Sequence, residues 1–222
     1  MKDGFIKVAA GTPDIRVADC EYNRAEITAL IDKAYATGVR ILALPELCIT
    51  GYTCQDLFFQ QALLDGALNS LREITEHTAG SDMLISVGCP LRFRGELYNC
   101  AVVLKDGKIL GVVPKKFLPN YNEFYEKRHF TAAPEGQFDI ELFGESVPFG
   151  LGLLFECRAM PELVFAAELC EDLWAAEPPS ISLALGGATI IANLSASNET
   201  IGKDMYRREL VNSQSARLLC GY

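Results

Sequence analysis

The chain has 222 residues and a formal net charge of −9 at pH 7, which disfavours nucleic acid as a partner because phosphate contacts require clustered lysine and arginine. Hydrophobic residues make up 50% of the sequence and charged residues 22%, as in globular proteins with a sizeable apolar core. No stretch is apolar over the length of a membrane helix, and the apolar stretch near the N-terminus is too short for a secretory signal.

The first elements of the chain alternate between strands and helices. Residues 5–10 (FIKVAA) are a strand candidate, and residues 19–37 predict a helix because apolar side chains recur there at helical spacing. The apolar stretch at 40–44 predicts a buried strand that stops at a proline. Residues 60–77 carry a second helical stripe, and MLISVG (83–88) predicts another buried strand.

A hairpin is predicted next. The stretches YNCAVVL and KILGVVP flank Asp106-Gly107, a pair that suits a tight turn with positive φ. The hairpin adds antiparallel strands, so the sheet is expected to be mixed.

The last predicted elements are two strands, at 162–169 and 189–195, and a helix from Tyr206 to Leu219. Strands that are apolar on both faces and alternate with helices predict an α/β fold, with helices over at least one face of the sheet. There is no internal repeat, low-complexity segment or linker, so we expect one domain over residues 1–222.

The eight cysteines form no CxxC pair and match no zinc spacing. Most lie beside apolar residues, where a free thiol behaves as a small hydrophobic side chain. We therefore expect free thiols in a reducing, cytoplasmic setting, with no metal site.

Three predicted strands end at residues suited to chemistry: Glu46, Lys115 and Cys170. Ligands of open α/β sheets bind at strand ends and in the loops that follow them. If the three side chains converge, Glu46 can accept the thiol proton, and the Lys115 ammonium can favour the thiolate and stabilise an oxyanion. That ammonium would offset the like charges of Glu171 and Asp172 beside the cysteine.

Simpler interpretations remain open for each residue. A lone cysteine at the end of an apolar strand is usually a packing residue, Glu46 could be a helix cap, and Lys115 could lie in a solvated turn. A cysteine–histidine dyad would depend on His129, because His77 falls in a presumed surface helix.

Four motifs resemble the nitrilase superfamily of carbon–nitrogen hydrolases and, more closely, the glutaminase domains of bacterial glutamine-dependent NAD synthetases. The motifs are PELCITGYTCQDLF, GVVPKKFLPNYNEFYEKRHF, CED and ATIIANLSASNETIGK. The resemblance implies an αββα sandwich of mixed, helix-covered sheets and a Glu–Lys–Cys triad, with Cys170 as nucleophile, Glu46 as general base and Lys115, rather than Lys116, as the cation. It also implies a second glutamate that orients the triad and the attacking water, which is Glu126 or, failing that, Glu123.

The resemblance further implies glutamine as substrate and a set of side chains that bind it. These residues are Tyr121, Phe124, Glu171, Trp174, Ser197 and Lys203. Glu171 can pair with the α-ammonium group of glutamine and Lys203 with its α-carboxylate, while the Ser197 hydroxyl can bond to either end. Without the resemblance, the three aromatic residues read as core packing, Glu171 as a surface ion-pair residue and SASNETIGK as a solvated loop.

The function expected from the resemblance is hydrolysis of the glutamine amide, which supplies ammonia to a synthetase domain for NAD synthesis. That domain is expected to be absent from this chain, because no SGGxDS loop occurs, and the chain stops at LLCGY, short of where the family's sandwich finishes. No cofactor is expected for the hydrolase step; ATP and Mg belong to the synthetase domain. The resemblance also implies that this chain is part of a homo-oligomer.

Three alternatives stay open at this point. One is a stand-alone ω-amidase or aliphatic amidase of the same superfamily. Another is a catalytically inactive interaction module. The third is redox sensing by Cys170, which would need Cys48 or Cys54 within bridging distance.

Overall fold

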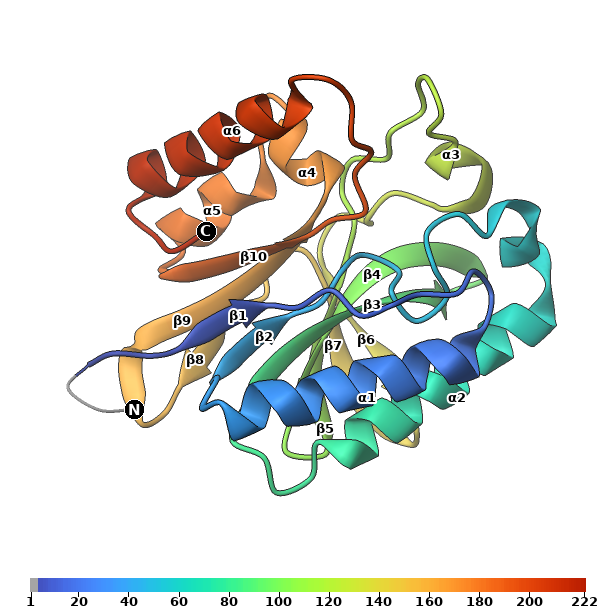
Figure 1. Ribbon diagram of the computed structural model, residues 1–222, viewed down its shortest axis with the longest axis horizontal. Coiled ribbons are helices and arrows are strands. Elements are labelled where there is room, and N and C mark those ends of the chain that lie inside the picture. The colour runs from blue at the N-terminus through green and yellow to red at the C-terminus, as the bar shows by residue number, and fades with distance from the viewer. Residues whose placement is uncertain (1–3) are drawn as a thin grey trace.

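The computed structural model describes residues 4–222, so residues 1–3 of the expected domain lie outside the described part. Two β-sheets face each other, and helices cover the outer face of each (Figure 1). The helices are α1 (Cys20–Ala36), α2 (Gln61–His77), α3 (Glu126–His129), α4 (Glu171–Trp174), α5 (Pro179–Leu185) and α6 (Lys203–Leu218), with a 3₁₀ helix η1 (Gln55–Phe59).

The larger sheet has seven strands in the order β1-β2-β3-β4-β5-β7-β6. Its strands are β1 (Val8–Ala10), β2 (Ile41–Ala43), β3 (Leu84–Phe93), β4 (Glu96–Lys105), β5 (Lys108–Pro114), β6 (Gln137–Leu142) and β7 (Glu145–Gly150). β1, β2 and β3 are parallel, whereas β3, β4 and β5 are antiparallel. The turn between β4 and β5 has φ of 50° at Asp106 and 72° at Gly107, as the sequence pair predicts.

The smaller sheet has three strands in the order β10-β9-β8. They are β8 (Phe155–Cys157), β9 (Met160–Leu169) and β10 (Ile190–Leu194). β9 and β10 are parallel, and β8 and β9 are antiparallel, so both sheets are mixed.

Successive side chains of a strand point to opposite faces of the sheet, and in the larger sheet both faces are buried. On β4, Val102 and Leu104 belong to the core beneath α1 and α2, whereas Ala101 and Val103 belong to the core between the sheets. The second core also takes side chains of β9, including Phe165 and others of the smaller sheet. Continuous apolar strands are therefore the consequence of burial on both faces.

The observed elements extend the predicted ones at several ends. β3 runs on to Phe93, α6 begins at Lys203 rather than Tyr206, and β1 covers only Val8–Ala10. The strands β6, β7 and β8 and the short helices α3, α4 and α5 were not among the predicted elements. Among the described residues, no helix is long and apolar enough to cross a membrane.

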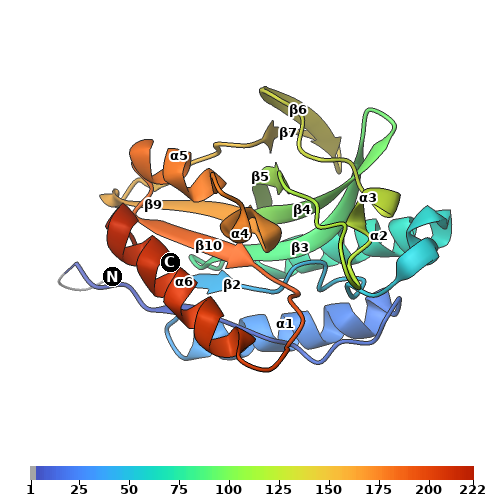
Figure 2. The same cartoon turned by 90° about the horizontal axis from the view of Figure 1, so that it is seen from above.

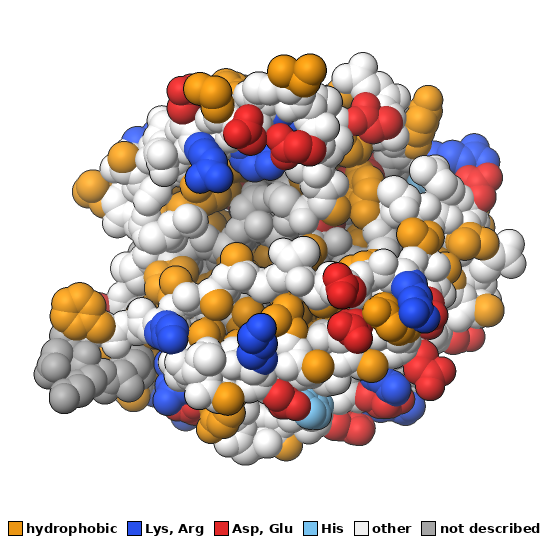
Figure 3. Space-filling view, viewed as in Figure 1, with side chains coloured by type: hydrophobic (Ala, Val, Ile, Leu, Met, Phe, Trp, Pro, Cys, Tyr) orange, Lys and Arg blue, Asp and Glu red, His pale blue; other side chains and the backbone are white. Residues whose placement is uncertain are grey.

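The surface is hollowed between the part that carries α6 and the part that carries α1 (Figure 3). Side chains of both charges are scattered over this face rather than gathered by sign. Seen from above, α3 and α4 lie at the same end of the two sheets (Figure 2). Glu126, in α3, and Cys170, directly before α4, are therefore found at that end.

Candidate active site

Cys170 occupies a sharp turn between β9 and α4. Its φ of 38° and ψ of −96° lie in a region that non-glycine residues rarely adopt. The turn is held because Cys170 N–H donates to Leu194 O at 3.0 Å and Leu173 N–H donates to Cys170 O at 3.1 Å. Strained backbone of this kind concentrates at functional sites, and here it directs a nearly buried thiol to a cavity wall.

Glu46 lies in the turn that follows β2 and is 1% exposed. Its Oε1 accepts hydrogen bonds from Lys115 Nζ and from Asn99 Nδ2, both at 2.7 Å. Its Oε2 accepts one from Ala196 N–H at 3.0 Å. Three hydrogen-bond donors from the protein therefore fix the two carboxylate oxygens of Glu46 in place of water.

Lys115 follows β5 and is completely buried between two carboxylates. Its Nζ lies 2.7 Å from Glu46 Oε1 and 2.5 Å from Glu126 Oε1. Burial by itself lowers the pKa of Lys115, but the two carboxylates raise it by more than burial lowers it. The net pKa is therefore above the usual range, and the group is an ammonium. Lys116 does not share this position, because its Nζ lies over the Phe117 ring at 4.9 Å.

Glu126, in α3, is the second buried carboxylate of the cluster. Tyr52 OH donates to its Oε1 at 2.7 Å, and Asn99 Nδ2 lies 3.4 Å from its Oε2. Burial and the charge of Glu46 raise the pKa of Glu126 to about 7, against the opposing effect of Lys115. Glu123, the other candidate from the sequence, is exposed and accepts a hydrogen bond from Asn198.

The thiol of Cys170 is protonated at rest. Burial and then the negative charge of Glu46 raise its pKa above the usual range, while the Lys115 ammonium and the Ala196 N–H act in the opposite direction. A thiol in these surroundings needs a base to become a nucleophile.

A cavity of about 140 Å³ opens in front of Cys170. All six side chains that the resemblance assigns to substrate binding line it, together with Pro119: Tyr121, Phe124, Glu171, Trp174, Ser197 and Lys203. Its wall therefore carries one acidic and one basic side chain among aromatic rings.

The charged groups of the cavity are held by neighbours. Tyr121 OH lies 3.0 and 2.9 Å from the two carboxylate oxygens of Glu171, and burial together with that carboxylate raises the pKa of Tyr121 to about 12. Lys203 Nζ lies 5.1 Å from the centre of the Trp174 ring and donates to Asn198. Tyr121 thus stays a hydroxyl donor, and an ammonium and a carboxylate face the same space.

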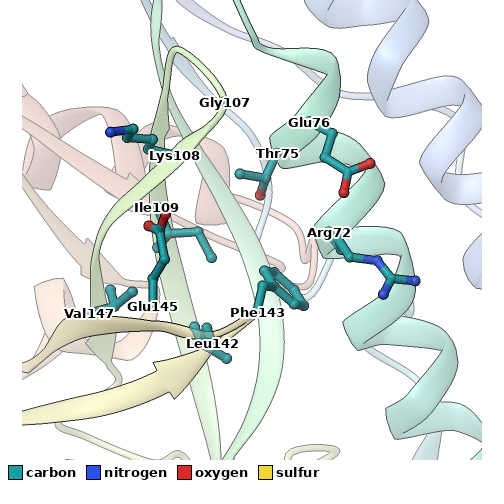
Figure 4. Close-up of a pocket in the computed structure, with 10 residues that line it drawn as sticks. All are labelled: Arg72, Thr75, Glu76, Gly107, Lys108, Ile109, Leu142, Phe143, Glu145 and Val147. Atoms are coloured by element: carbon teal, nitrogen blue, oxygen red, sulfur yellow. The ribbon is translucent and has the colours of Figure 1, made fainter.

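Two other hollows lack this chemistry. The pocket in Figure 4 lies between α2 and the β5, β6 and β7 region, with Arg72 and Glu76 on the helix and Lys108 pointing away from them. A cavity of about 530 Å³ between the sheets is lined mainly by apolar side chains. Cys170 lines neither of them, so size alone does not locate the site.

His129 does not take part in the cluster. Its Nε2 lies 3.2 Å from Asp56, and its ring packs against Phe58 and Phe59. No group of three or more metal-ligating side chains occurs within residues 4–222.

Sequence reasoning missed two polar residues of the cluster. Asn99 donates to Glu46 and lies near Glu126, and Tyr52 donates to Glu126. The signal for Asn99 was available, because it is a polar residue inside an apolar strand. The sequence predicts Asp172 only as a charge that disfavours the thiolate, and the structure shows it fully buried.

The carbon–nitrogen hydrolase family model matches residues 7–221. The chain belongs to the carbon–nitrogen hydrolase family. It is 40% identical over 219 residues to the glutamine-dependent NAD(+) synthetase of Mycobacterium tuberculosis and 32% identical over 204 residues to that of Aquifex aeolicus. These matches cover 99% and 92% of this chain but 32% of each relative, so the chain spans about a third of the length of the curated relatives it matches.

Solved structures of carbon–nitrogen hydrolases have the same fold. A glutamine-dependent NAD(+) synthetase from Cytophaga hutchinsonii superposes with a TM-score of 0.86 at 32% identity, covering 97% of this chain and 34% of that one. An amidase from Nesterenkonia sp. superposes with a TM-score of 0.74 at 16% identity, covering 99% and 75%. The predicted family and the nitrilase-like fold are confirmed, and the chain is a carbon–nitrogen hydrolase.

Proposed function

We propose that this chain hydrolyses the side-chain amide of glutamine through a Cys170–Glu46–Lys115 triad. The observation that carries the proposal is the cavity in front of Cys170, whose wall includes the Glu171 carboxylate and the Lys203 ammonium. A free amino acid presents the two complementary charges. The two curated relatives named above are glutamine-dependent NAD(+) synthetases, and their names support the same substrate.

In the first half-reaction, Glu46 takes the thiol proton and the Cys170 sulfur attacks the amide carbon. The carbonyl oxygen becomes an oxyanion that the Lys115 ammonium and the backbone N–H after Cys170 stabilise. Glu46 then returns the proton to the departing nitrogen, and the C–N bond breaks. The products of this half are ammonia and a γ-glutamyl thioester on Cys170.

In the second half-reaction, Glu46 takes a proton from water, and the resulting hydroxide attacks the thioester carbon. The C–S bond breaks, the proton returns to sulfur, and glutamate leaves. The reaction therefore needs no cofactor to supply a proton or an electron. Glu126 holds Lys115 from its far side, so the ammonium keeps its place while Glu46 changes charge.

Substrate selection follows from the two charged side chains of the cavity. Glu171 is placed to accept the α-ammonium group, with Tyr121 orienting its oxygens. Lys203 is placed to receive the α-carboxylate. A stand-alone amidase acting on uncharged amides needs neither group, so the pair favours glutamine over that alternative.

The larger role we propose is release of ammonia for NAD synthesis by a synthetase domain. Relatives about three times as long as this chain support it by name. The eight free cysteines fit a reducing compartment such as the cytoplasm.

The test is ammonia release from glutamine by the purified protein, with Glu171→Gln as the informative variant. Loss of the charge at the α-ammonium site should raise KM for glutamine about tenfold or more and leave hydrolysis of an uncharged short-chain amide unchanged. Cys170→Ala should abolish both activities, and a diazo-ketone analogue of glutamine should add to Cys170 by mass spectrometry.

The matched control is Glu177→Gln, an exposed acid beyond α4 that does not line the cavity. Equal kinetics for Glu171→Gln and the wild type would assign the chain to amidases of uncharged substrates. A folded protein that forms no adduct on Cys170 would identify an inactive module.

A further inference from the structure

A second buried acid, Asp172, connects the two chain segments that carry the nucleophile and the cation. It lies two residues after Cys170 and is 0% exposed. Its Oδ1 accepts hydrogen bonds from Phe117 N–H at 2.8 Å and from Lys116 N–H at 3.1 Å. Its Oδ2 accepts one from Leu169 N–H at 3.0 Å.

These three donors flank the site on both sides. Lys116 and Phe117 directly follow Lys115, at the end of β5 in the larger sheet. Leu169 directly precedes Cys170, at the end of β9 in the smaller sheet. One carboxylate therefore joins the end of a strand in each sheet, at the two points where the chain turns to present the ammonium and the sulfur.

We propose that Asp172 is a positioning residue that sets the separation between the Lys115 ammonium and the Cys170 sulfur by binding the backbone of both segments. Its kinetic consequence rests on the proposed glutamine hydrolysis; its effect on the thiol does not. Asp172 itself touches neither the sulfur nor the ammonium, so it acts through the backbone that holds them.

The position requires an aspartate for a chemical reason. All of the groups that point at its side chain are N–H donors, and a carboxylate offers an acceptor oxygen on each side. An asparagine offers one oxygen and one NH₂ group, so one of the two segments would face a donor instead of an acceptor. Asparagine is thus nearly identical in shape yet releases either the Lys115 segment or the Cys170 segment.

Glu168 provides a matched control on the other side of the nucleophile. It lies two residues before Cys170, is 1% exposed, and accepts a hydrogen bond from Ser180 N–H at 2.7 Å. Its other contacts are with Asn193 and Tyr222. None of these partners belongs to the segment after Lys115, so Glu168→Gln disturbs a buried acid without releasing the ammonium.

The experiment measures the rate at which iodoacetamide alkylates Cys170 at pH 8 and 9, above the pKa of about 7 to which burial raises Asp172, resolved by peptide mass spectrometry in the full chain. Loss of the nearby ammonium leaves less thiolate, so Asp172→Asn should alkylate about tenfold more slowly than the wild type at each pH. General loosening of the fold would have the opposite sign, because it exposes the thiol. Buried Cys89 and Cys100 should stay unmodified, which shows that the core is intact.

Kinetics with glutamine supply the second measurement. Asp172→Asn should lower kcat by about tenfold or more with a much smaller change in KM, since the cavity groups are untouched. Glu168→Gln should keep the wild-type alkylation rate. An Asp172→Asn protein that alkylates as fast as the wild type, or a Glu168→Gln protein that slows equally, would overturn the proposal.

Two further outcomes are separable. If Asp172→Asn does not accumulate as folded protein, Asp172→Glu is the second variant, because it keeps two acceptor oxygens but displaces them by one methylene. Asp172→Glu should also slow alkylation of Cys170. An alkylation rate equal to that of the wild type would overturn the proposal. If the wild type does not hydrolyse glutamine while Asp172→Asn still slows alkylation, the proposed substrate is wrong and the role of Asp172 stands.

Discussion

Single residues determine the electrostatics of the site, and the clearest case is Glu126. Its folded-state pKa of about 7 lies above the usual value of a glutamate, so the folded protein binds this proton more tightly than the unfolded chain does. The resulting stability is fully present below the unfolded pKa and is lost as the pH rises through 7. Each unit of difference in pKa corresponds to about 1.4 kcal/mol.

We therefore expect the free energy of unfolding of the wild type to fall between pH 5 and pH 8, and Glu126→Gln to show a smaller fall. Asp172 contributes in the same direction, because burial raises its pKa to about 7 as well, so the variant keeps part of the slope. Urea unfolding at the two pH values measures the difference. Glu123→Gln is the control, since that exposed side chain should leave the slope as it is; an unchanged slope in Glu126→Gln would contradict the prediction.

The same scale shows what the sequence could predict about the site. Glu46, Lys115 and Cys170 each follow an apolar strand, and the sequence alone therefore makes them candidates. Their roles are proposed from a resemblance. The structure shows Lys115 Nζ 2.7 Å from Glu46 Oε1, and the charges of both groups act on the Cys170 thiol. Tyr52 could not be found by spacing, because it contacts Glu126 across 74 residues of sequence. Asn99 contacts Glu46 across 53 residues, and the sequence marks it only as a polar residue within an apolar strand.

At the level of elements, the turn that carries Glu46 packs directly on β3 at Gly88. A Cβ atom at Gly88 would lie 2.2 Å from Leu47 N and 2.4 Å from Pro45 O, and both are backbone atoms. Even alanine must therefore displace the turn. Glycine in this strand is required by close approach of another backbone segment rather than by its φ angle.

Gly88→Ala should lower stability by roughly 1–3 kcal/mol and should lower kcat for glutamine by about tenfold or more, because the turn takes Glu46 with it. Melting temperature and steady-state kinetics test the two effects. Gly66→Ala in α2 is the control: its Cβ would meet Cys20 at 3.5 Å, and alanine favours the helix, so activity should not change. Full activity in Gly88→Ala would show that the turn can move without displacing Glu46.

Elements with strong periodicity were predictable, and those without it were not. The helices α1 and α2 and the β4–β5 hairpin were found because each carries a long stripe or a distinctive turn pair. The helices α3 and α4 have four residues each, which is too short for apolar side chains to recur at helical spacing. The β6–β7 hairpin was overlooked although Phe138, Ile140 and Leu142 alternate with polar residues, which is a pattern of period two.

For the whole molecule, the site depends on the packing of one sheet against the other. Glu46 and Lys115 come from the larger sheet and Cys170 from the smaller. The core between the sheets is shared, since Ile41 and Val103 on one side belong to the same buried cluster as Phe165 and Leu194 on the other. Neither sheet can hold the site alone, and neither can bury its inner face alone.

The shared core predicts that the two sheets unfold together. Trp174 is the single tryptophan and lies beside the smaller sheet, whereas Cys89 is buried in the larger one. In a urea titration, Trp174 fluorescence, Cys89 alkylation and far-ultraviolet circular dichroism should give one common midpoint, as expected for a two-state transition. A Trp174 midpoint below that of Cys89 would mean that the smaller sheet separates first. In that case Cys170, the proposed nucleophile, would separate from Glu46 and Lys115 while most of the molecule was still folded, and activity would follow the Trp174 curve.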